Sequence, residues 1–258
     1  MRDIITIYKP VGMTPLQAII AVKNHLPELK TEKITYAGRL DPLAHGVLLL
    51  LIGEATKQRE EYMALPKTYE FEVLLGIETD SYDILGYVKN VITKEVGKNV
   101  KLIVNTFVNN HIGKQSHSYP PYSSKVVTGK PLFWWAKNNK LNEITIPKRE
   151  IEIFDFKCIG VDEISLEILE LKINKAISLV TGDFRQEKIL KRWGKVFSSS
   201  ENKSAKLTTI KFSISCTSGT YVRELVHQLG KEIGCGAIAL NILRTSIGNY
   251  ELKDSVKL

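Results

Sequence analysis

Tyr36-Ala-Gly-Arg-Leu-Asp41-Pro-Leu-Ala-His-Gly-Val-Leu48 is the stretch that decides the fold, because a polar loop here leads directly into a strand without a polar face. The apolar run from Val47 continues to Ile52, which predicts a strand buried on both faces. Such a strand needs covering layers on both sides of its sheet. We therefore expect a folded chain built around this strand, with the loop at one end of it.

Asp41 lies in this loop between a glycine and a proline, a rigid setting from which its side chain could face a cleft. The alternative is structural, since Asp before Pro is a common N-cap and N1 pair at the start of a helical turn. The local pattern alone favours the cap. A catalytic role for Asp41 therefore needs support from elsewhere in the chain.

Outward from this loop, strands and helices are mixed without regular alternation. Strands are expected at 4–8, 34–36, 47–52, 68–75 with its partner 84–92, 125–127, 144–159 paired with 164–173, 210–216 and 246–252. Helices are expected at 15–26, 54–63, 94–109, 131–139 and 221–233. This predicts an α+β fold with a large, mainly antiparallel sheet, and one catalytic domain over residues 1–258.

Composition narrows the class of protein. The 258 residues carry 36 Lys and Arg against 28 Asp and Glu, a net charge of +8. Such a surplus often marks contact with phosphates or anionic lipids, although a generally basic surface explains it too. Three separated cysteines fit neither a disulfide framework nor a zinc site. Without a signal peptide or a long apolar run, we expect a cytoplasmic protein with no membrane role.

Residues 174–206 differ in composition from their surroundings. A basic helical piece, 188–193, precedes the polar run 198–206. We interpret the segment as a basic surface insertion with a flexible tail.

Two further residues stand out. Arg223 falls in the first turn of its expected helix, where the macrodipole disfavours a cation, so an anionic partner is expected. An arginine facing a loop carboxylate would keep it ionised and orient it. Tyr69 begins a strand and could stack on a base or exchange a proton, although a cross-strand aromatic is the simpler interpretation.

Other kinds of site find no sequence support. The chain has no phosphate-binding or dinucleotide-binding glycine loop, no His-Glu-x-x-His helix and no Gly-x-Ser-x-Gly elbow. Its five histidines lack metal-ligand spacing with the cysteines. We expect a reaction that needs neither a metal nor another cofactor.

The loop around Asp41 resembles the Gly-x-Leu-Asp-Pro-x-Ala-x-Gly motif of TruB-type pseudouridine synthases. Colinear segments extend the resemblance from residue 8 to about 250. They are Tyr8-Lys-Pro-Val-Gly-Met-Thr14, Gly53-Glu-Ala-Thr-Lys57, Lys67-Thr-Tyr69, Leu75-Gly-Ile-Glu-Thr-Asp-Ser-Tyr-Asp83, Pro120-Pro-Tyr-Ser-Ser-Lys125 with Gly129-Lys130, Ser215-Cys-Thr-Ser-Gly-Thr-Tyr-Val-Arg223, Gly234-Cys-Gly-Ala237 and Leu243-Arg-Thr245.

The resemblance implies the pseudouridine synthase fold, with Asp41 as the catalytic carboxylate, Arg223 as its partner and Tyr69 stacked on the target base and aiding proton removal. It implies a monomer that isomerises a flipped-out uridine, most often in the T-arm loop of tRNA. Aromatic and basic residues there would hold RNA by stacking and charge. The expected RNA- and base-binding residues are Lys9, Tyr36, Gly38, Arg39, Leu40, Lys67, Tyr122, Lys125, Lys130, Tyr221 and Ile242.

The sequence departs from the family pattern at several points. Thr35-Tyr36-Ala37-Gly38 replaces the usual Gly-His-Thr-Gly, so the target loop is less defined, and Arg39 and Ile242 replace a small residue and a leucine. No room remains for the C-terminal PUA-type module of many relatives, and residues 174–206 are hypothesised to grip RNA instead. Unchanged RNA affinity after their deletion would count against this.

Three alternatives to a tRNA synthase remain open at this stage. The chain could be a non-catalytic tRNA-binding or tRNA-folding protein on the same scaffold, a synthase acting on a different RNA, or an RNA N-glycosylase that releases uracil.

Overall fold

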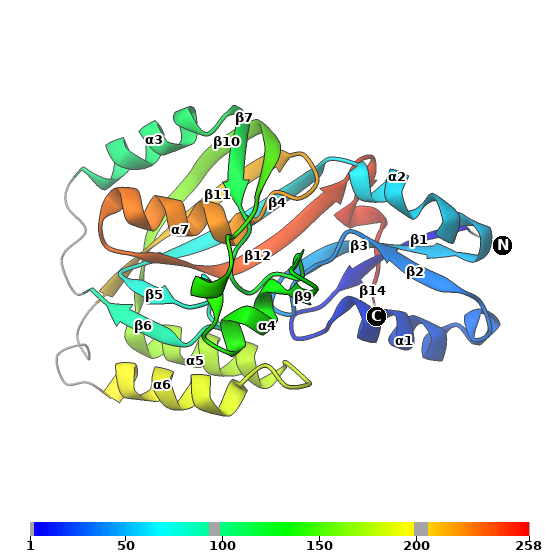
Figure 1. Ribbon diagram of the computed structural model, residues 1–258, viewed down its shortest axis with the longest axis horizontal. Coiled ribbons are helices and arrows are strands. Elements are labelled where there is room, and N and C mark those ends of the chain that lie inside the picture. The colour runs from blue at the N-terminus through cyan, green and yellow to red at the C-terminus, as the bar shows by residue number, and fades with distance from the viewer. Residues whose placement is uncertain (1–2, 93–98, 199–205, 258) are drawn as a thin grey trace.

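A ten-stranded mixed sheet runs along the molecule, with helices on both of its faces (Figure 1). The computed structural model describes residues 3–92, 99–198 and 206–257. The strand order is β14-β1-β3-β12-β4-β11-β10-β7, with β2 beside β3 and β13 beside β12. Among the described strands of this sheet, β1 with β14 and β3 with β12 pair in parallel and the other pairs are antiparallel. The predicted α+β class is confirmed.

The elements have the following bounds. The strands are β1 (Ile4–Lys9), β2 (Ile34–Ala37), β3 (His45–Ile52), β4 (Lys67–Leu75), β5 (Ile77–Thr79), β6 (Val88–Val91), β7 (Gly113–Ser118), β8 (Val126–Val127), β9 (Lys130–Pro131), β10 (Lys148–Ser165), β11 (Lys206–Cys216), β12 (Ala237–Ile247), β13 (Tyr250–Glu251) and β14 (Val256–Lys257). The helices are α1 (Pro15–His25), α2 (Arg59–Ala64), α3 (Val100–Asn110), α4 (Leu132–Lys137), α5 (Leu166–Ser178), α6 (Gln186–Ser198) and α7 (Val222–Ile233).

Strand β3 is buried on both faces, as its sequence predicts. Leu48 and Leu50 pack with α1 in one cluster, whereas Leu49 and Leu51 point to the opposite cluster beneath α2. Helix α1 begins at Pro15, as its sequence predicts, because the Thr14 side chain accepts a hydrogen bond from the Gln17 amide while Gln17 bonds back to Thr14. The β2–β3 loop that carries Asp41 is thus anchored on a rigid strand.

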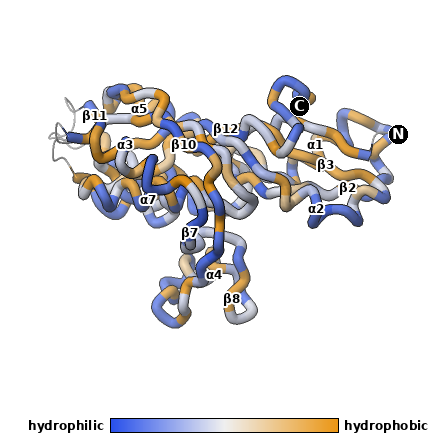
Figure 2. Tube along the Cα trace, turned by 90° about the horizontal axis from the view of Figure 1, so that it is seen from above, coloured by the Kyte–Doolittle hydropathy of each residue, from blue (hydrophilic) through white to orange (hydrophobic). Residues whose placement is uncertain are grey.

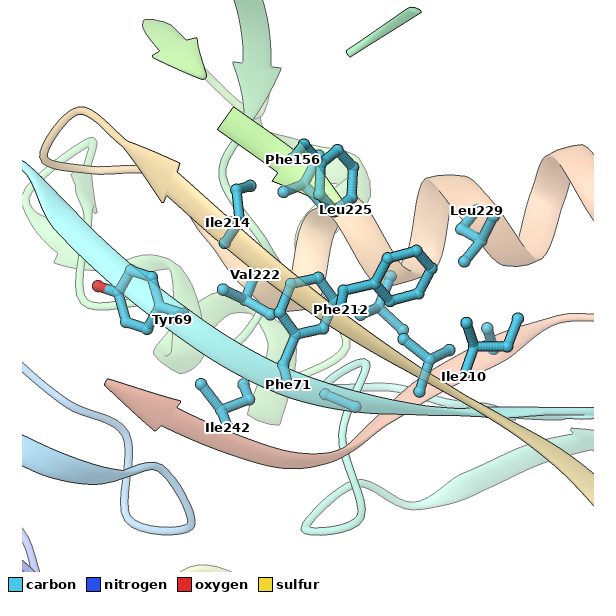
Figure 3. Close-up of a cluster of buried hydrophobic side chains, with 14 of the residues drawn as sticks. Tyr69, Phe71, Phe156, Ile210, Phe212, Ile214, Val222, Leu225, Leu229 and Ile242 are labelled. Carbon is cyan, nitrogen blue, oxygen red and sulfur yellow. The ribbon is translucent and has the colours of Figure 1, made fainter. Parts of the chain in front are cut away.

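A central hydrophobic cluster fills one face of the sheet under α3 and α7 (Figure 3). Phe71 of β4 and Phe212 of β11 stack with ring centroids 5.2 Å apart, and Leu225 of α7 closes over them. Tyr69 lies at one end of this row of side chains in Figure 3. The helix expected at 221–233 is present as α7, and its apolar residues pack on this cluster, which brings the start of the helix over the sheet.

Helices α5 and α6 cover the opposite face (Figure 1). Trp193 of α6 is fully buried and donates its indole N–H to the Ile84 carbonyl at 3.1 Å. The predicted basic helical piece is present, but its apolar side belongs to the core, because Ile189, Trp193 and Val196 recur at helical spacing. One side of this helix therefore packs into the core and the other is exposed, and the surface insertion expected over residues 174–206 stays a prediction. The expected tail at 199–205 lies outside the described residues.

Several predicted elements differ from the structure. Residues 164–173 alternate like a strand, yet Ser165 caps helix α5, and Leu169 and Ile173 are buried while Leu171 is exposed. Residues 84–92 do not pair with β4, because they contain β6, which pairs with β5, while β4 lies between β11 and β12. The predicted closing strand at 246–252 is the end of β12 plus β13. Of the helix expected at 94–109, residues 94–98 lie outside the described residues.

Residues 119–147, between β7 and β10, form an arm that contains β8, β9 and α4. Figure 2 shows this arm projecting from the body of the molecule. Figure 1 shows α4 in front of the sheet, beside the start of β3. The arm thus overhangs the part of the sheet next to the Asp41 loop. No helix in the described ranges is both long and apolar enough to cross a membrane.

Candidate active site

The loop that carries Asp41 is fixed from behind by two buried basic side chains. Arg244 of β12, 1% exposed, donates to the carbonyl oxygens of Val47 at 2.8 Å, Gly38 at 3.1 Å and Arg39 at 3.4 Å. The Lys9 ammonium reaches the Pro42 carbonyl at 3.3 Å. These bonds immobilise the backbone on both sides of Asp41.

Asp41 does not cap a helix. Residues 42–44 form a bend that leads straight into β3, so the cap interpretation was wrong. The Oδ2 atom of Asp41 instead accepts a hydrogen bond from Arg223 Nε at 2.8 Å. The side chain of Arg223 is 3% exposed and that of Asp41 is 34% exposed. The structure thus brings the two residues together across 182 positions of sequence, with the carboxylate open to solvent and the guanidinium behind it.

Arg223 is held by more than Asp41. It donates to the carbonyls of Ser81 at 2.8 Å and Tyr122 at 3.3 Å, and its Nε lies 3.7 Å from Asp83 Oδ2. Two carboxylates therefore offset the unfavourable dipole at the start of α7, as the sequence predicts for an anionic partner. With its donors distributed among these acceptors, the guanidinium is fixed in one orientation.

Asp83 is the more buried of the two carboxylates. Burial raises its pKa to about 6, although the Arg223 charge and a hydrogen bond from Ser81 act in the opposite direction. Its Oδ1 also accepts from the Leu85 amide at 3.0 Å. Asp83 is thus a structural counter-charge for Arg223, and Asp41 is the carboxylate left accessible.

Tyr69 lies behind the site. Its ring is 9% exposed, and it sits on β4 directly across from Arg244 of β12. Burial raises the pKa of the Tyr69 hydroxyl, while the Arg244 charge acts in the opposite direction, so the group is a neutral phenol near pH 7.

A cleft of about 400 Å³ opens in front of Asp41 and Arg223. Its walls come from the Asp41 loop, the start of α1, the turn around Asp83, the arm and the connector between α5 and α6. The predicted site residues that line it are Tyr36, Arg39, Leu40, Asp41, Tyr122 and Arg223. Tyr69 is not among the lining residues. The volume suits one nucleoside unit.

Other predicted RNA-binding residues lie around the cleft. Lys125 and Lys130 are exposed on the arm, above the rings of Tyr119 at 5.5 Å and Trp134 at 3.5 Å. Tyr221 packs edge-on against Tyr119, with ring centroids 5.6 Å apart. The two lysines remain accessible for phosphate contacts.

The structure contradicts a direct RNA contact for three predicted residues, Lys9, Lys67 and Ile242. Lys9 is 0% and Lys67 4% exposed, and backbone carbonyls surround both ammonium groups. An RNA phosphate cannot reach either of them. Ile242 packs in the central core at 8% exposure. These buried residues support the site from inside the fold. The sequence alone did not distinguish this supporting role from direct contact with RNA. Gly38 is half-buried and gives its carbonyl to Arg244, so an RNA contact at Gly38 stays a prediction.

Lys9 gives stability a dependence on pH. Burial lowers its pKa to about 7 in the folded chain, against roughly 10.4 for a free lysine. Between these values the unfolded chain binds more protons, so the free energy of unfolding should rise with pH. The free energy of unfolding of the natural protein should therefore rise with pH more steeply than that of Lys9→Met, by on the order of 1 kcal/mol per pH unit. Urea unfolding at pH 7.5 and 9 measures it, with exposed Lys30→Met as control; equal slopes for Lys9→Met and the natural protein would contradict the assignment.

Two site residues were missed from the sequence. Arg244 and Asp83 both occur in segments that carry the resemblance, yet neither was singled out. An arginine inside an otherwise apolar strand was the available signal, because arginine is almost never fully buried unless it has partners. Nothing local marked Asp83, whose importance depends on a helix 140 positions away in the chain.

The arrangement is suited to chemistry at an electron-poor carbon. The accessible carboxylate of Asp41, held by the buried guanidinium of Arg223, can stabilise a developing positive charge. The described residues place no group of three or more His, Cys, Asp or Glu side chains where they could hold a metal ion.

The curated proteins described next, which are similar to this chain, share one name. The chain is 30% identical over 260 residues to tRNA pseudouridine synthase B of Clostridioides difficile (strain 630), covering 100% of this chain and 69% of that protein. It is 31% identical over 255 residues to tRNA pseudouridine synthase B of Bacillus subtilis (strain 168), covering 98% and 68%.

Solved structures show the same fold at low identity. A chain from the crystal structure of a Cbf5-Nop10-Gar1 complex aligns with a TM-score of 0.59 and 17% identity, covering 99% of this chain. A chain from an H/ACA RNP bound to a substrate RNA containing 2'-deoxyuridine aligns with a TM-score of 0.54 and 16% identity. This protein spans about half the length of each of those chains, 52% and 50%.

The family model covers the Asp41 loop, the turn around Asp83 and strands β2, β3, β4, β7 and β10 of the large sheet. The N-terminal domain of the TruB family pseudouridylate synthases matches residues 27–178, which is more than half of the sequence. Together with relatives at 30% identity along the whole chain, this match shows that the protein belongs to the TruB family of pseudouridylate synthases.

Proposed function

We propose that this pseudouridine synthase isomerises a flipped-out uridine in the T-arm loop of tRNA, with Asp41 as its catalytic carboxylate. The observation that carries the proposal is the contact of 2.8 Å between Asp41 and the buried Arg223 at the 400 Å³ cleft. A carboxylate needed only for RNA binding would gain nothing from such a costly buried partner.

Isomerisation exchanges one bond of the base for another. The bond from ribose C1′ to N1 breaks, the base rotates within the cleft, and C1′ joins C5. The proton on C5 then leaves and N1 ends protonated. Asp41 stabilises the electron-poor C1′ while the glycosidic bond is broken, and Arg223 keeps that carboxylate aimed at the cleft. One ionised carboxylate and a pocket that excludes water are sufficient.

Tyr69 is proposed to flank the target base and take part in removing the C5 proton. Its hydroxyl is protonated near pH 7, so it acts through its oxygen lone pair and passes on its own proton. Arg244, which is opposite Tyr69 in the sheet, would stabilise the partial negative charge on the oxygen. Because the ring is buried behind the cleft, the base must enter beyond the cleft lining to reach it.

RNA recognition is assigned to groups around the mouth of the cleft. Arg39, Lys125 and Lys130 are exposed and can meet phosphates, while Tyr36 and Tyr122 present rings in the cleft lining for stacking. Phosphate contacts and stacking would offset the few kcal/mol needed to flip the uridine out. We propose a monomeric cytoplasmic enzyme in which residues 1–258 act as one catalytic domain.

The test is to incubate the protein with unmodified total tRNA and map pseudouridine at single-nucleotide resolution. One new site in the T-arm loop is expected. Modification confined to another loop or another RNA class would overturn the T-arm assignment, and tight tRNA binding without product would favour a tRNA-folding protein. Release of free uracil would indicate an N-glycosylase instead.

A further inference from the structure

The connector between α5 and α6 forms part of the catalytic cleft. Asp183, Phe184 and Arg185 line the same cavity as Asp41, although they lie far from it in sequence. The connector is attached to the start of α1 by a hydrogen bond from Gln17 to Thr181. A segment that composition suggested to be a surface insertion therefore supplies a wall of the active site.

Arg185 is the charged residue of this wall with the densest contacts. Its guanidinium donates to both carboxylate oxygens of Asp80, at 2.7 and 3.2 Å, and lies over the ring of Tyr122 at 4.3 Å from the centroid. The Tyr122 hydroxyl donates to Asp80 Oδ2 at 3.0 Å. The side chains of Arg185 and Asp80 are 23% and 14% exposed, so this is a partly buried, two-point ion pair.

The backbone of Arg185 is strained, which supports a specific role. Its φ is +65°, a left-handed conformation that costs a non-glycine residue on the order of 1 kcal/mol. The Gln186 side chain holds this turn by donating to the carbonyls of Val180 at 3.0 Å and Gly182 at 2.7 Å. The turn aims the arginine inward rather than toward solvent.

The two groups that Arg185 joins belong to the segments that orient Arg223. Asp80 precedes Ser81, whose carbonyl accepts from Arg223 Nη1 at 2.8 Å, and the Tyr122 carbonyl accepts from Nη2 at 3.3 Å. Movement of either segment would shift the guanidinium that aims Asp41. Arg185 therefore ties the Asp80 turn to the arm at the point where both hold Arg223.

We propose that Arg185 is a positioning residue for the Asp41–Arg223 pair, and that the α5–α6 connector completes the active site. The inference rests on the proposed function, since it concerns the alignment of the proposed catalytic carboxylate. We expect Arg185 to affect kcat rather than the affinity for RNA. The reason is that its N–H donors already bond to Asp80 and the face of its guanidinium lies over the Tyr122 ring.

Arg185→Gln tests the proposal with a tRNA substrate. We expect kcat to fall about 10- to 100-fold, the size of effect that follows displacement of a catalytic group by about an ångström. The KM for tRNA should change less than about threefold. Asp80→Asn should give a similar loss, and the double variant should lose little more than either single one, because both break the same tie.

Lys101→Gln is the matched control, because it removes one positive charge from an exposed position on α3, which covers the other face of the sheet. Its kcat should equal that of the natural protein. The proposal would be overturned if Arg185→Gln kept the kcat of the natural protein, or if only its KM rose. It would also be overturned if the effects of Arg185→Gln and Asp80→Asn were fully additive. A rise in KM with an unchanged kcat would indicate that Arg185 contacts an RNA phosphate.

The variant Arg185→Lys shows whether a loss of activity comes from a folding defect or from a misplaced active site. Lysine keeps the charge but cannot bridge both oxygens of Asp80 while lying flat on Tyr122, so its kcat should also fall with an unchanged melting temperature. A natural kcat for Arg185→Lys would overturn the proposal. Failure of the natural protein to make pseudouridine would instead contradict the proposed function, so the two failures are distinguishable.

Discussion

Replacement of Asp41 by Asn is expected to reduce pseudouridine formation at least about 10⁴-fold, the scale of loss seen when a reacting group is removed from an active site. Asparagine has the same shape, so the loop held by Arg244 and Lys9 should keep its conformation. The neutral amide cannot stabilise positive charge at C1′ as a carboxylate does. Single-turnover nucleoside analysis of modified tRNA measures the rate, and filter binding measures the affinity.

Binding of tRNA by Asp41→Asn should stay within about threefold of the natural protein, because one carboxylate in the cleft adds little to a contact dominated by phosphates. Asp254→Asn makes the same chemical change at an exposed position and should leave both quantities unaltered. Near-natural turnover in Asp41→Asn would sink the catalytic assignment.

Replacement of Arg223 by Met is expected to impair both stability and activity. Methionine fills similar space but leaves the carboxylates of Asp41 and Asp83 beside each other without a cation. Loss of one partner from a buried ion pair costs about 3–5 kcal/mol. Turnover should fall at least about 100-fold, because Asp41 loses the group that orients it. Urea unfolding and single-turnover kinetics measure the two effects.

The second carboxylate allows the two effects of Arg223 to be separated. The pKa of Asp83 is already raised to about 6, and removal of Arg223 takes away the largest influence that lowers it. The double variant Arg223→Met with Asp83→Asn should therefore recover much of the stability at pH 8, where an unpaired Asp83 is most costly, without recovering turnover. Recovery of turnover together with stability would show that Arg223 acts only on folding. Lys231→Gln, at the exposed end of α7, is the control for charge loss in this helix.

Local sequence was reliable where one element's own residues decide its structure. The apolar run 47–52 predicted a strand buried on both faces, and the pattern of residues 15–26 predicted α1 to within one residue at its end. It failed at residues 164–173, where apolar residues satisfy a strand period and a helical period at once. Burial of Leu169 and Ile173, with Leu171 left exposed, settles this segment as a helix, because the sheet face beneath it accepts only the helical set.

For the site, colinear motifs led to the family and to Asp41, Tyr69 and Arg223, because those residue types recur at fixed points in the chain. They did not distinguish a lysine that meets RNA from one that holds a loop. Lys9 and Lys67 look like surface cations in sequence, yet backbone carbonyls enclose both ammonium groups.

The sequence by itself determined the class of fold, the buried strand at its centre, the loop that carries Asp41 and the family to which the chain belongs. Only the tertiary structure decided which charges meet. Arg223 reaches Asp41 from 182 positions away, Arg244 holds the same loop from 206 positions away at Gly38, and Arg185 reaches Asp80 across 105. Ion pairs and carbonyl contacts of this kind depend on how the sheet and helices pack, and no local pattern of residues records that packing.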